Sequence, residues 1–217
     1  LARSSSKLRK HYLSLLQTAI NSFTTTHYTQ DMLKVKCFVC NSFCENSYVV
    51  YDDNTKECAI IDAGFYYADE EDAVSYFIDS NNLKVKHLIN THLHLDHCFG
   101  VTYISEKYGV ELSADDEDIM LLNLIPQQCE MFGIKLNAPV PTLKKIIKEG
   151  DKVEIGNYTL TAISVPGHSP GSLCYYCKEE GILFSGDVLF KESIGRTDLY
   201  GGSYKALNEN INSKIFT

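Results

Sequence analysis

The stretch Thr91-His92-Leu93-His94-Leu95-Asp96-His97 is dense in metal-binding side chains, with three histidines and one aspartate within six residues. It follows the apolar run 85–90, which is typical of a buried strand. Alternate residues of an extended chain point to one side, so we expect His92, His94 and Asp96 to share a face, with His97 turned beside Asp96. Clustered imidazoles and a carboxylate are costly to bury without partners. The stretch therefore predicts a metal site rather than a solvated polar loop.

The chain of 217 residues suits one domain with a sizeable core. Up to Gln30 it has no acidic residue, four basic ones and many Ser and Thr. That composition is typical of a transit peptide, but it also suits a frayed leader or translated upstream sequence. Patterned structure starts near Met32. We expect a disordered or loosely helical leader or upstream extension over 1–31 and one domain over 32–217.

Charge and hydropathy narrow the classes of partner. The formal net charge is −8 and the only basic block is Lys7-Leu8-Arg9-Lys10, which disfavours nucleic acid because a polyanion needs clustered Lys and Arg. No apolar run approaches the roughly 20 residues of a membrane span, so we expect a soluble protein. Without a secretory signal, we expect reduced cysteines and a cytoplasmic location. The sequence leaves the oligomeric state open.

Two pairs among the eight cysteines, 37/40 and 174/177, have the Cys-x-x-Cys spacing of a zinc ribbon. Both pairs lie in strand-like runs. In a strand, residues i and i+3 face opposite sides, whereas a zinc knuckle needs a turn between its cysteines. This favours small apolar core residues over a zinc ribbon.

Hydrophobic periodicity predicts strands in two groups, before and between helices. The strand-like runs are 34–40, 47–51, 57–61, 85–90, 152–155, 158–164, 172–177 and 181–185. Helical patterns cover 69–80 and 99–107. This order predicts an α/β fold with two sheets and helices outside them.

Three further segments have local signals. The acidic residues at 114–118 suit the start of a helix better than a calcium site, because acids in a first turn favour the helix dipole. A Pro-containing loop is expected over 135–142. Near the end of the chain, one helical stripe is formed by Tyr204, Leu207, Ile211 and Ile215.

Two motifs later in the chain add candidate ligands. Val165-Pro166-Gly167-His168-Ser169-Pro170-Gly171-Ser172 places a histidine in a rigid turn directly after a strand, and Phe184-Ser185-Gly186-Asp187-Val188 places a carboxylate at the end of another. Either residue alone is more often structural. Together with the stretch at 91–97, His168 and Asp187 become candidate metal ligands.

These motifs, in this order, resemble those of the metallo-β-lactamase-fold hydrolases. The stretch Ser193-Ile194-Gly195-Arg196-Thr197-Asp198-Leu199 narrows the resemblance to the short bacterial glyoxalase II-like branch, which is related to hydroxyacylglutathione hydrolase. The resemblance runs from about Met32 to Thr217. It implies an αββα four-layer sandwich.

The resemblance also implies a centre for two divalent metal ions, zinc being favoured by the imidazoles and iron or manganese being the alternatives. It assigns His92, His94 and His168 to the first ion, Asp96 and His97 to the second, and Asp187 to both. A metal-bound hydroxide would attack the carbonyl of a small-molecule thioester or ester, with Asp96 and Asp187 as catalytic residues. Asp62 is expected either to orient a ligand imidazole or to form a turn.

The family pattern contains one more metal-binding histidine, after the segment that would follow Thr217. We therefore expect a C-terminally truncated domain, without its final strand and helix, that holds its second metal more weakly than its first. Arg196 is expected to pair either with a substrate carboxylate or with a protein carboxylate. The helical domain with which long glyoxalase II enzymes bind glutathione has no counterpart here, so glutathione itself is not assured.

Two alternatives stay open. A persulfide dioxygenase of the same superfamily uses one iron, which His94, His168 and Asp187 would hold here, although the Asp96/His97 pair favours the hydrolase. A non-catalytic metal-binding protein on a degenerate scaffold is the other.

Overall fold

The computed structural model describes residues 32–217, so the leader expected over 1–31 lies outside the described residues. A six-stranded sheet has the order β1-β2-β3-β4-β5-β6, antiparallel among its first three strands and parallel from β3 onward. Its strands are β1 (Leu33–Cys40), β2 (Glu45–Asp52), β3 (Glu57–Ile61), β4 (Lys84–Ile89), β5 (Leu112–Ala114) and β6 (Lys145–Ile146).

A second, antiparallel sheet has the order β10-β9-β8-β7. Its strands are β7 (Lys152–Ile155), β8 (Tyr158–Ser164), β9 (Leu173–Cys177) and β10 (Ile182–Phe184). A small hairpin follows, made of β11 (Leu189–Phe190) and β12 (Ser193–Ile194). All eight runs with a strand pattern in the sequence are strands in the structure.

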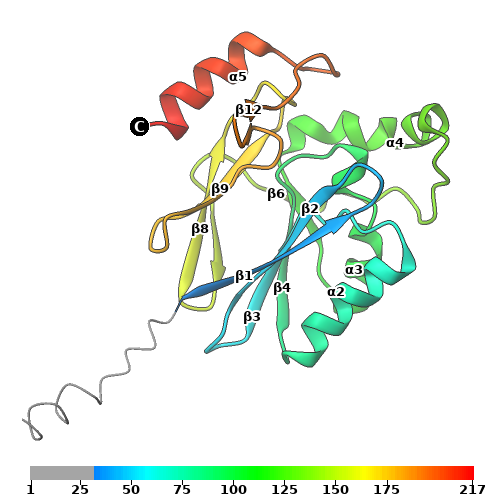
Figure 1. The fold of residues 1–217 in the computed structure, drawn as a ribbon, viewed down its shortest axis with the longest axis vertical. Coiled ribbons are helices and arrows are strands. Elements are labelled where there is room, and N and C mark those ends of the chain that lie inside the picture. Colours follow the sequence, from blue (N-terminus) through cyan, green and yellow to red (C-terminus); the bar gives the residue numbers. More distant parts are fainter. Residues whose placement is uncertain (1–31) are drawn as a thin grey trace, which may run out of the picture. The chain divides into compact units, whose positions relative to one another are not determined.

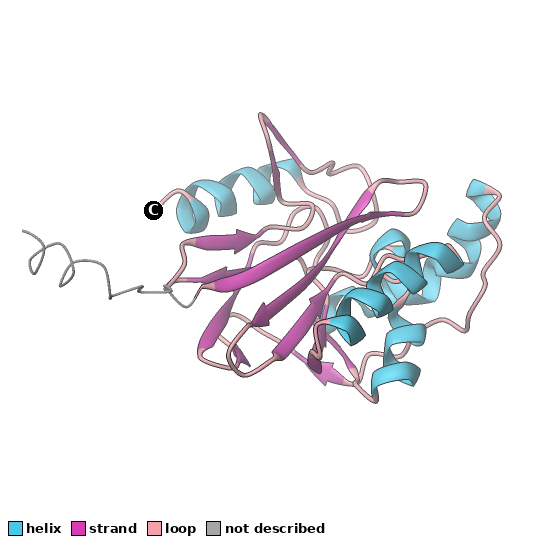
Figure 2. Ribbon diagram, turned by 60° about the horizontal axis from the view of Figure 1, so that its bottom comes forward, coloured by secondary structure: helices cyan, strands magenta, loops and turns pink. Residues whose placement is uncertain are grey.

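Helices cover the outer face of each sheet (Figures 1 and 2). The first sheet carries α2 (Ala68–Ser80), α3 (Val101–Tyr108) and α4 (Ile119–Phe132), and the second carries α5 (Tyr204–Asn210), which continues as a π-helical turn over Ile211–Ile215. The layers are therefore helix, sheet, sheet and helix, which confirms the αββα sandwich. No helix of residues 32–217 is both long and apolar enough to cross a lipid bilayer.

Three apolar cores lie between these four layers. Strand β3 contributes to two of them: Cys58 and Ile60 pack towards the helices, and Ala59 and Ile61 pack towards the second sheet. Because alternate side chains of a strand point to opposite faces, one central strand supplies both cores. The third core joins the second sheet to α5 and contains Val165, Cys174, Val188, Leu207 and Ile211.

The cysteines bear out the strand interpretation. All eight are free thiols, and Cys174 and Cys177 face different cores, as i and i+3 in a strand must. The core interpretation is wrong for Cys37, which is exposed, whereas Cys40 is buried. No cysteine of residues 32–217 belongs to a group of side chains that could share a metal ion.

The acidic segment caps a helix, as predicted. The Asp115 carboxylate accepts a hydrogen bond from the Glu117 amide at 2.9 Å, and a 3₁₀ turn over Asp116–Asp118 leads into α4. The helical stripe near the end is only partly correct. Leu207 and Ile211 are buried, but Tyr204 is exposed.

Candidate metal centre

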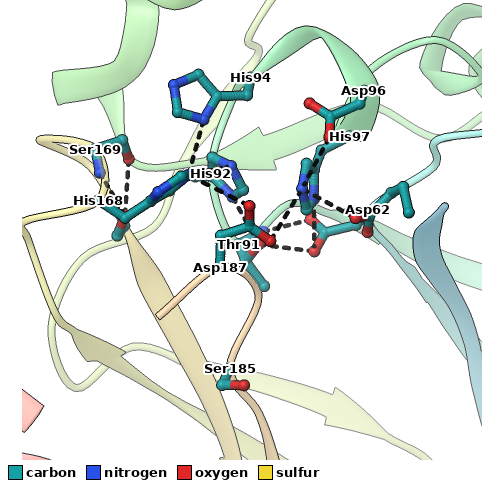
Figure 3. Close-up of polar contacts among 12 residues, drawn as sticks. Asp62, Thr91, His92, His94, Asp96, His97, His168, Ser169, Ser185 and Asp187 are labelled. Atoms are coloured by element: carbon teal, nitrogen blue, oxygen red, sulfur yellow. Dashed lines mark hydrogen bonds and ion pairs between the residues drawn. The ribbon is translucent and has the colours of Figure 1, made fainter. Parts of the chain in front are cut away.

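Three buried histidines place their ring nitrogens against one another (Figure 3). His92 and His94 follow strand β4, and His168 follows strand β8. Nε2 of His168 lies 2.9 Å from Nδ1 of His94 and 3.1 Å from Nε2 of His92. The ends of two strands from different sheets therefore bring together residues that are far apart in the sequence.

Hydrogen bonds on the far sides of two of these rings fix which nitrogen faces the cluster. Nδ1 of His168 donates to the main-chain oxygen of Arg196 at 2.8 Å, because a carbonyl can only accept. Nδ1 of His92 donates to the Thr91 hydroxyl at 3.1 Å, since that hydroxyl itself donates to Asp62 at 2.7 Å. In its neutral form, each ring therefore turns an unprotonated Nε2 towards the cluster.

This arrangement fits a divalent metal ion. Two nitrogens that share a tetrahedral zinc, each about 2.05 Å from it, lie roughly 3.3 Å apart, close to the observed separations. Burial lowers the pKa of His94 to about 3, and burial with neighbouring imidazoles lowers the pKa of His92 well below its usual value. Neutral imidazoles are the form that binds metals.

A second group of donors surrounds His97, which is buried in a 3₁₀ turn over Leu95–His97. Four carboxylates lie within 4 Å of its ring: Glu45 at 3.1 Å, Asp62 at 3.2 Å, Asp187 at 3.6 Å and Asp96 at 3.8 Å. Their charges, led by Glu45 and Asp62, overcome the effect of burial and raise the pKa of His97 well above its usual value. The group is rich in oxygen donors, unlike the three-histidine group.

The expectation that Asp96 shares a face with His92 and His94 is wrong. The chain is extended only as far as His94, and the 3₁₀ turn that begins at Leu95 directs Asp96 towards His97 instead. Asp96 and His97 are thus adjacent, as expected, but in the second group.

Asp187 lies between the two groups (Figure 3). Its Oδ1 is 3.6 Å from Nε2 of His97, and its Oδ2 is 3.6 Å from Nε2 of His168. Burial acts to raise the pKa of Asp187, but His97 and the other imidazoles outweigh it, so the pKa lies below its usual value. An ionised carboxylate with one oxygen towards each group can bridge two cations.

Glu45 is the main donor that the sequence motifs do not contain. It is the first residue of β2, is 8% exposed, and directs Oε2 at Nε2 of His97. Burial raises the pKa of Glu45 to about 8. The sequence signal that could have found it is an acid at the start of a strand, which is weak by itself.

The family model of the metallo-beta-lactamase superfamily matches residues 44–215, a range that includes every donor of both groups. The chain belongs to this superfamily. The superfamily binds metal ions, and its donors in this chain are the clustered histidine and carboxylate side chains.

Relatives within the superfamily catalyse more than one reaction. Hydroxyacylglutathione hydrolase GloC of Haemophilus influenzae is 30% identical over 185 residues, covering 84% of this chain and 84% of that protein. The mitochondrial persulfide dioxygenase ETHE1 of Mus musculus is 29% identical over 174 residues, covering 80% of this chain and 59% of that protein.

Solved structures agree with the fold. The B3 metallo-beta-lactamase BLEG-1 has a TM-score of 0.72 and 31% identity, covering 84% of this chain and 85% of that chain. TTHA1623, solved in a di-iron-bound form, has a TM-score of 0.70 and 27% identity, covering 82% of this chain and 84% of that chain. The metallo-β-lactamase fold extends over most of the chain.

Arg196 of this superfamily member contacts a protein carboxylate. Its Nε and Nη2 each donate to Asp198 at 2.8 Å, and both side chains are exposed. Of the two alternatives for Arg196, the structure contains the salt bridge. Its main-chain oxygen, which orients His168, has a role that side-chain motifs cannot reveal.

Asp118 ties together the loops that carry the first group. This fully buried carboxylate accepts hydrogen bonds from the Leu93 amide at 3.2 Å, the Ser169 hydroxyl at 2.8 Å and the Gly171 amide at 2.7 Å. Leu93 lies between two candidate ligands and Ser169 follows a third. Asp118 therefore fixes the two loops relative to each other.

The second group opens into a cavity of about 350 Å³. Its lining includes the acidic residues Glu45, Asp62, Asp96 and Asp187 together with His97. Aromatic and apolar residues also line it: Phe43, Tyr48, Leu189 and Phe190. Lys191, at the tip of the β11–β12 hairpin, is the one lysine or arginine among the described residues that line the cavity.

Proposed function

We propose that this protein is a metal-dependent hydrolase whose substrate is a small thioester or ester of the hydroxyacylglutathione class. The observation that carries the proposal is Asp187, whose two carboxylate oxygens face two separate groups of buried donors. The similarity to hydroxyacylglutathione hydrolase GloC supports the choice of substrate class.

The proposed ligands follow from the two groups. We assign His92, His94 and His168 to the first divalent ion, Asp96 and His97 to the second, and Asp187 to both. Imidazole ligands favour zinc, and the di-iron form of TTHA1623 keeps iron as an alternative. Divalent ions held by these residues would supply a bound water of lowered pKa and positive charge to stabilise a carbonyl oxygen.

The remaining chemistry falls to side chains of this chain. Asp96 is positioned at the cavity to accept a proton through its carboxylate, and burial raises its pKa, which makes it a better base. Asp62 lies 3.2 Å from Nδ1 of His97 as an ion-pair partner and accepts a hydrogen bond from the Thr91 hydroxyl that contacts His92, so it faces one imidazole of each group.

A thioester suits this cavity better than an amide. A thiolate, whose conjugate acid has a pKa of about 8–9, leaves without first being protonated. An amine leaving group must in addition be protonated as it departs. Aromatic residues Phe43 and Phe190 offer an apolar surface to the acyl or thiol part, and Lys191 offers a partner for a substrate carboxylate.

The alternative function is that of a persulfide dioxygenase, which the similarity to ETHE1 supports. The second group favours the hydrolase, because a centre with one iron does not require the additional donors around His97. The eight free cysteines support a reducing compartment, such as the cytoplasm.

The test compares two activities of the metal-loaded protein. We expect hydrolysis of S-lactoylglutathione and no oxygen consumption with glutathione persulfide, and we expect Asp187→Ala to abolish the hydrolysis. Oxygen consumption without hydrolysis would favour the dioxygenase. Metal binding without either activity would favour a non-catalytic protein.

A further inference from the structure

The side of His97 that faces the cavity is approached by more carboxyl groups than one ring nitrogen can pair with. Nε2 of His97 is approached by Glu45, Asp187 and Asp96, while Asp62 occupies the Nδ1 side. His97 is 1% exposed, and neither of its ring nitrogens has a hydrogen-bond partner of acceptable geometry. Gathering carboxylates around a buried ring is unfavourable unless a cation joins them.

We propose that Glu45 is a ligand of the second metal ion, together with Asp96, His97 and Asp187. This inference rests on the two-metal centre of the proposed function and adds a donor that the sequence motifs do not contain.

The distance between Glu45 and His97 fits two ligands of one ion. Donors held about 2.1 Å from one divalent ion lie roughly 3.0–3.4 Å apart when the angle between them is 90–109°. Oε2 of Glu45 is 3.1 Å from Nε2 of His97, closer than the corresponding oxygens of Asp187 and Asp96. Glu45 also lines the cavity, so its carboxylate faces the space in which an ion would sit.

The surrounding chain holds Glu45 in this position. The Asn41 side chain donates to the main-chain oxygens of Gly64 at 2.8 Å and Asp96 at 3.0 Å, which joins the β1–β2 turn to the ligand loop. A β-carbon at Gly64 would lie 2.9 Å from Cγ of Glu45 and 2.5 Å from the main-chain oxygen of Asp96. Glycine therefore lets the two donor segments approach each other.

A simple ion pair between Glu45 and a protonated His97 explains less. The single N–H at Nε2 of His97 can pair with one carboxyl group, whereas three carboxyl groups are directed at that nitrogen. A divalent ion satisfies all three carboxylates and leaves the Nδ1 side of His97 to Asp62.

The proposal changes what we expect of metal choice. The first site offers three imidazoles, whereas the second offers one imidazole and three carboxylates. Oxygen-rich donor sets favour harder ions such as manganese, and imidazole-rich sets favour zinc. The sequence motifs, which omit Glu45, predict a weakened second site; with Glu45 included, we expect a second equivalent of metal to bind.

The experiment measures metal binding without substrate. Metal-free wild type, Glu45→Gln and Glu209→Gln are titrated with Zn²⁺ and with Mn²⁺ by calorimetry, and bound metal is counted by elemental analysis. Glu209 lies on the exposed face of α5 and controls for loss of one carboxylate. In Glu45→Gln we expect the first equivalent to keep its Kd within about threefold and the second to weaken at least about 100-fold, since even residues that only orient ligands contribute 10–100-fold. Glu209→Gln should match wild type.

Two results would overturn the proposal: a second equivalent in Glu45→Gln with wild-type Kd, or equal weakening of both equivalents. Circular dichroism checks that the variant folds. If it does not, Glu45→Asp decides, because its shorter carboxylate should weaken only the second equivalent, and an unchanged Kd would contradict the assignment. Two equivalents bound by wild type without any hydrolysis would refute the proposed function and leave the role of Glu45 intact.

Discussion

Gly195 packs directly against the main chain of Asp187: a β-carbon at residue 195 would lie 1.7 Å from the Asp187 carbonyl oxygen. The same β-carbon would lie 3.3 Å from Nδ1 of His168. The β11–β12 hairpin thus returns the chain to the metal centre, and the next residue, Arg196, orients His168 through its main-chain oxygen. Two proposed ligands depend on a close approach that only glycine permits.

The first prediction concerns this contact. Gly195→Ala should displace Asp187 and weaken metal binding by at least about tenfold, since misplacing an orienting group costs 10–100-fold in affinity. Calorimetric titration of the metal-free variant checks this. Gly181→Asn is the control, because that turn is open and asparagine tolerates its φ of +64°. Wild-type affinity in Gly195→Ala would show that Asp187 does not depend on this contact.

Asp118 should stabilise the first group through its three hydrogen bonds. Asp118→Asn replaces an acceptor by an amide whose NH₂ faces other donors, so we expect the free energy of unfolding to fall by about 2–4 kcal/mol. Urea unfolding of the metal-free protein measures it. Glu117→Gln, at the exposed neighbouring position, should cost much less. Equal effects of the two substitutions would argue against the buried contacts as the cause.

Lys191 should select for anionic substrates. Lys191→Ala is expected to raise KM for S-lactoylglutathione about threefold to tenfold with kcat nearly unchanged, the range of a partly exposed ion pair. Arg196→Ala should change KM less, because its guanidinium is paired with Asp198. Steady-state kinetics with an uncharged thioester is the control, and its KM should not move. A larger increase in KM for Arg196→Ala than for Lys191→Ala would indicate that Arg196, not Lys191, pairs with the substrate carboxylate.

Asp52 should make stability depend on pH. Burial acts to raise its pKa, but hydrogen bonds from the Asn157 and Asn54 amides and the Thr55 hydroxyl outweigh burial, so the pKa of Asp52 lies below its usual value. Its contribution is therefore present above the unfolded pKa of about 3.9 and is lost as pH falls through the lower folded pKa.

Asp52→Asn should accordingly destabilise the metal-free protein by about 1–3 kcal/mol near pH 7. The difference from wild type should narrow below about pH 4, where Asp52 becomes protonated. Urea unfolding between pH 3 and pH 7 measures both quantities. A difference that stays constant down to pH 3 would mean that the charge of Asp52 is not involved.

Much of the fold follows from local sequence. Alternate side chains of strands such as β3 and β9 pack into two different cores. Such strands are recognisable in the sequence as short apolar runs, because both of their faces are buried. The ligand motifs are recognisable because each lies directly after an apolar strand, where histidine and aspartate residues stand out from their surroundings. His92, His94, His168 and Asp187 were therefore accessible as candidates.

Other features depend on tertiary structure and leave little local signal. Glu45 and Asp118 act on segments that are distant in sequence, and the role of Arg196 in orienting His168 belongs to its main chain. Strand β6 and the β11–β12 hairpin have two-residue strands, too short for periodicity. The 3₁₀ turn that separates Asp96 from His92 and His94 begins within an extended-looking run, so alternation assigned Asp96 to the wrong group.

The most direct test of the metal-dependent hydrolase is the initial rate of S-lactoylglutathione hydrolysis as divalent metal is added to the metal-free chain. We expect no hydrolysis without metal, a rate that rises and saturates at two equivalents per chain, and no rise in Asp187→Ala. Hydrolysis that is already present without metal, or that is equal in Asp187→Ala, would contradict the account.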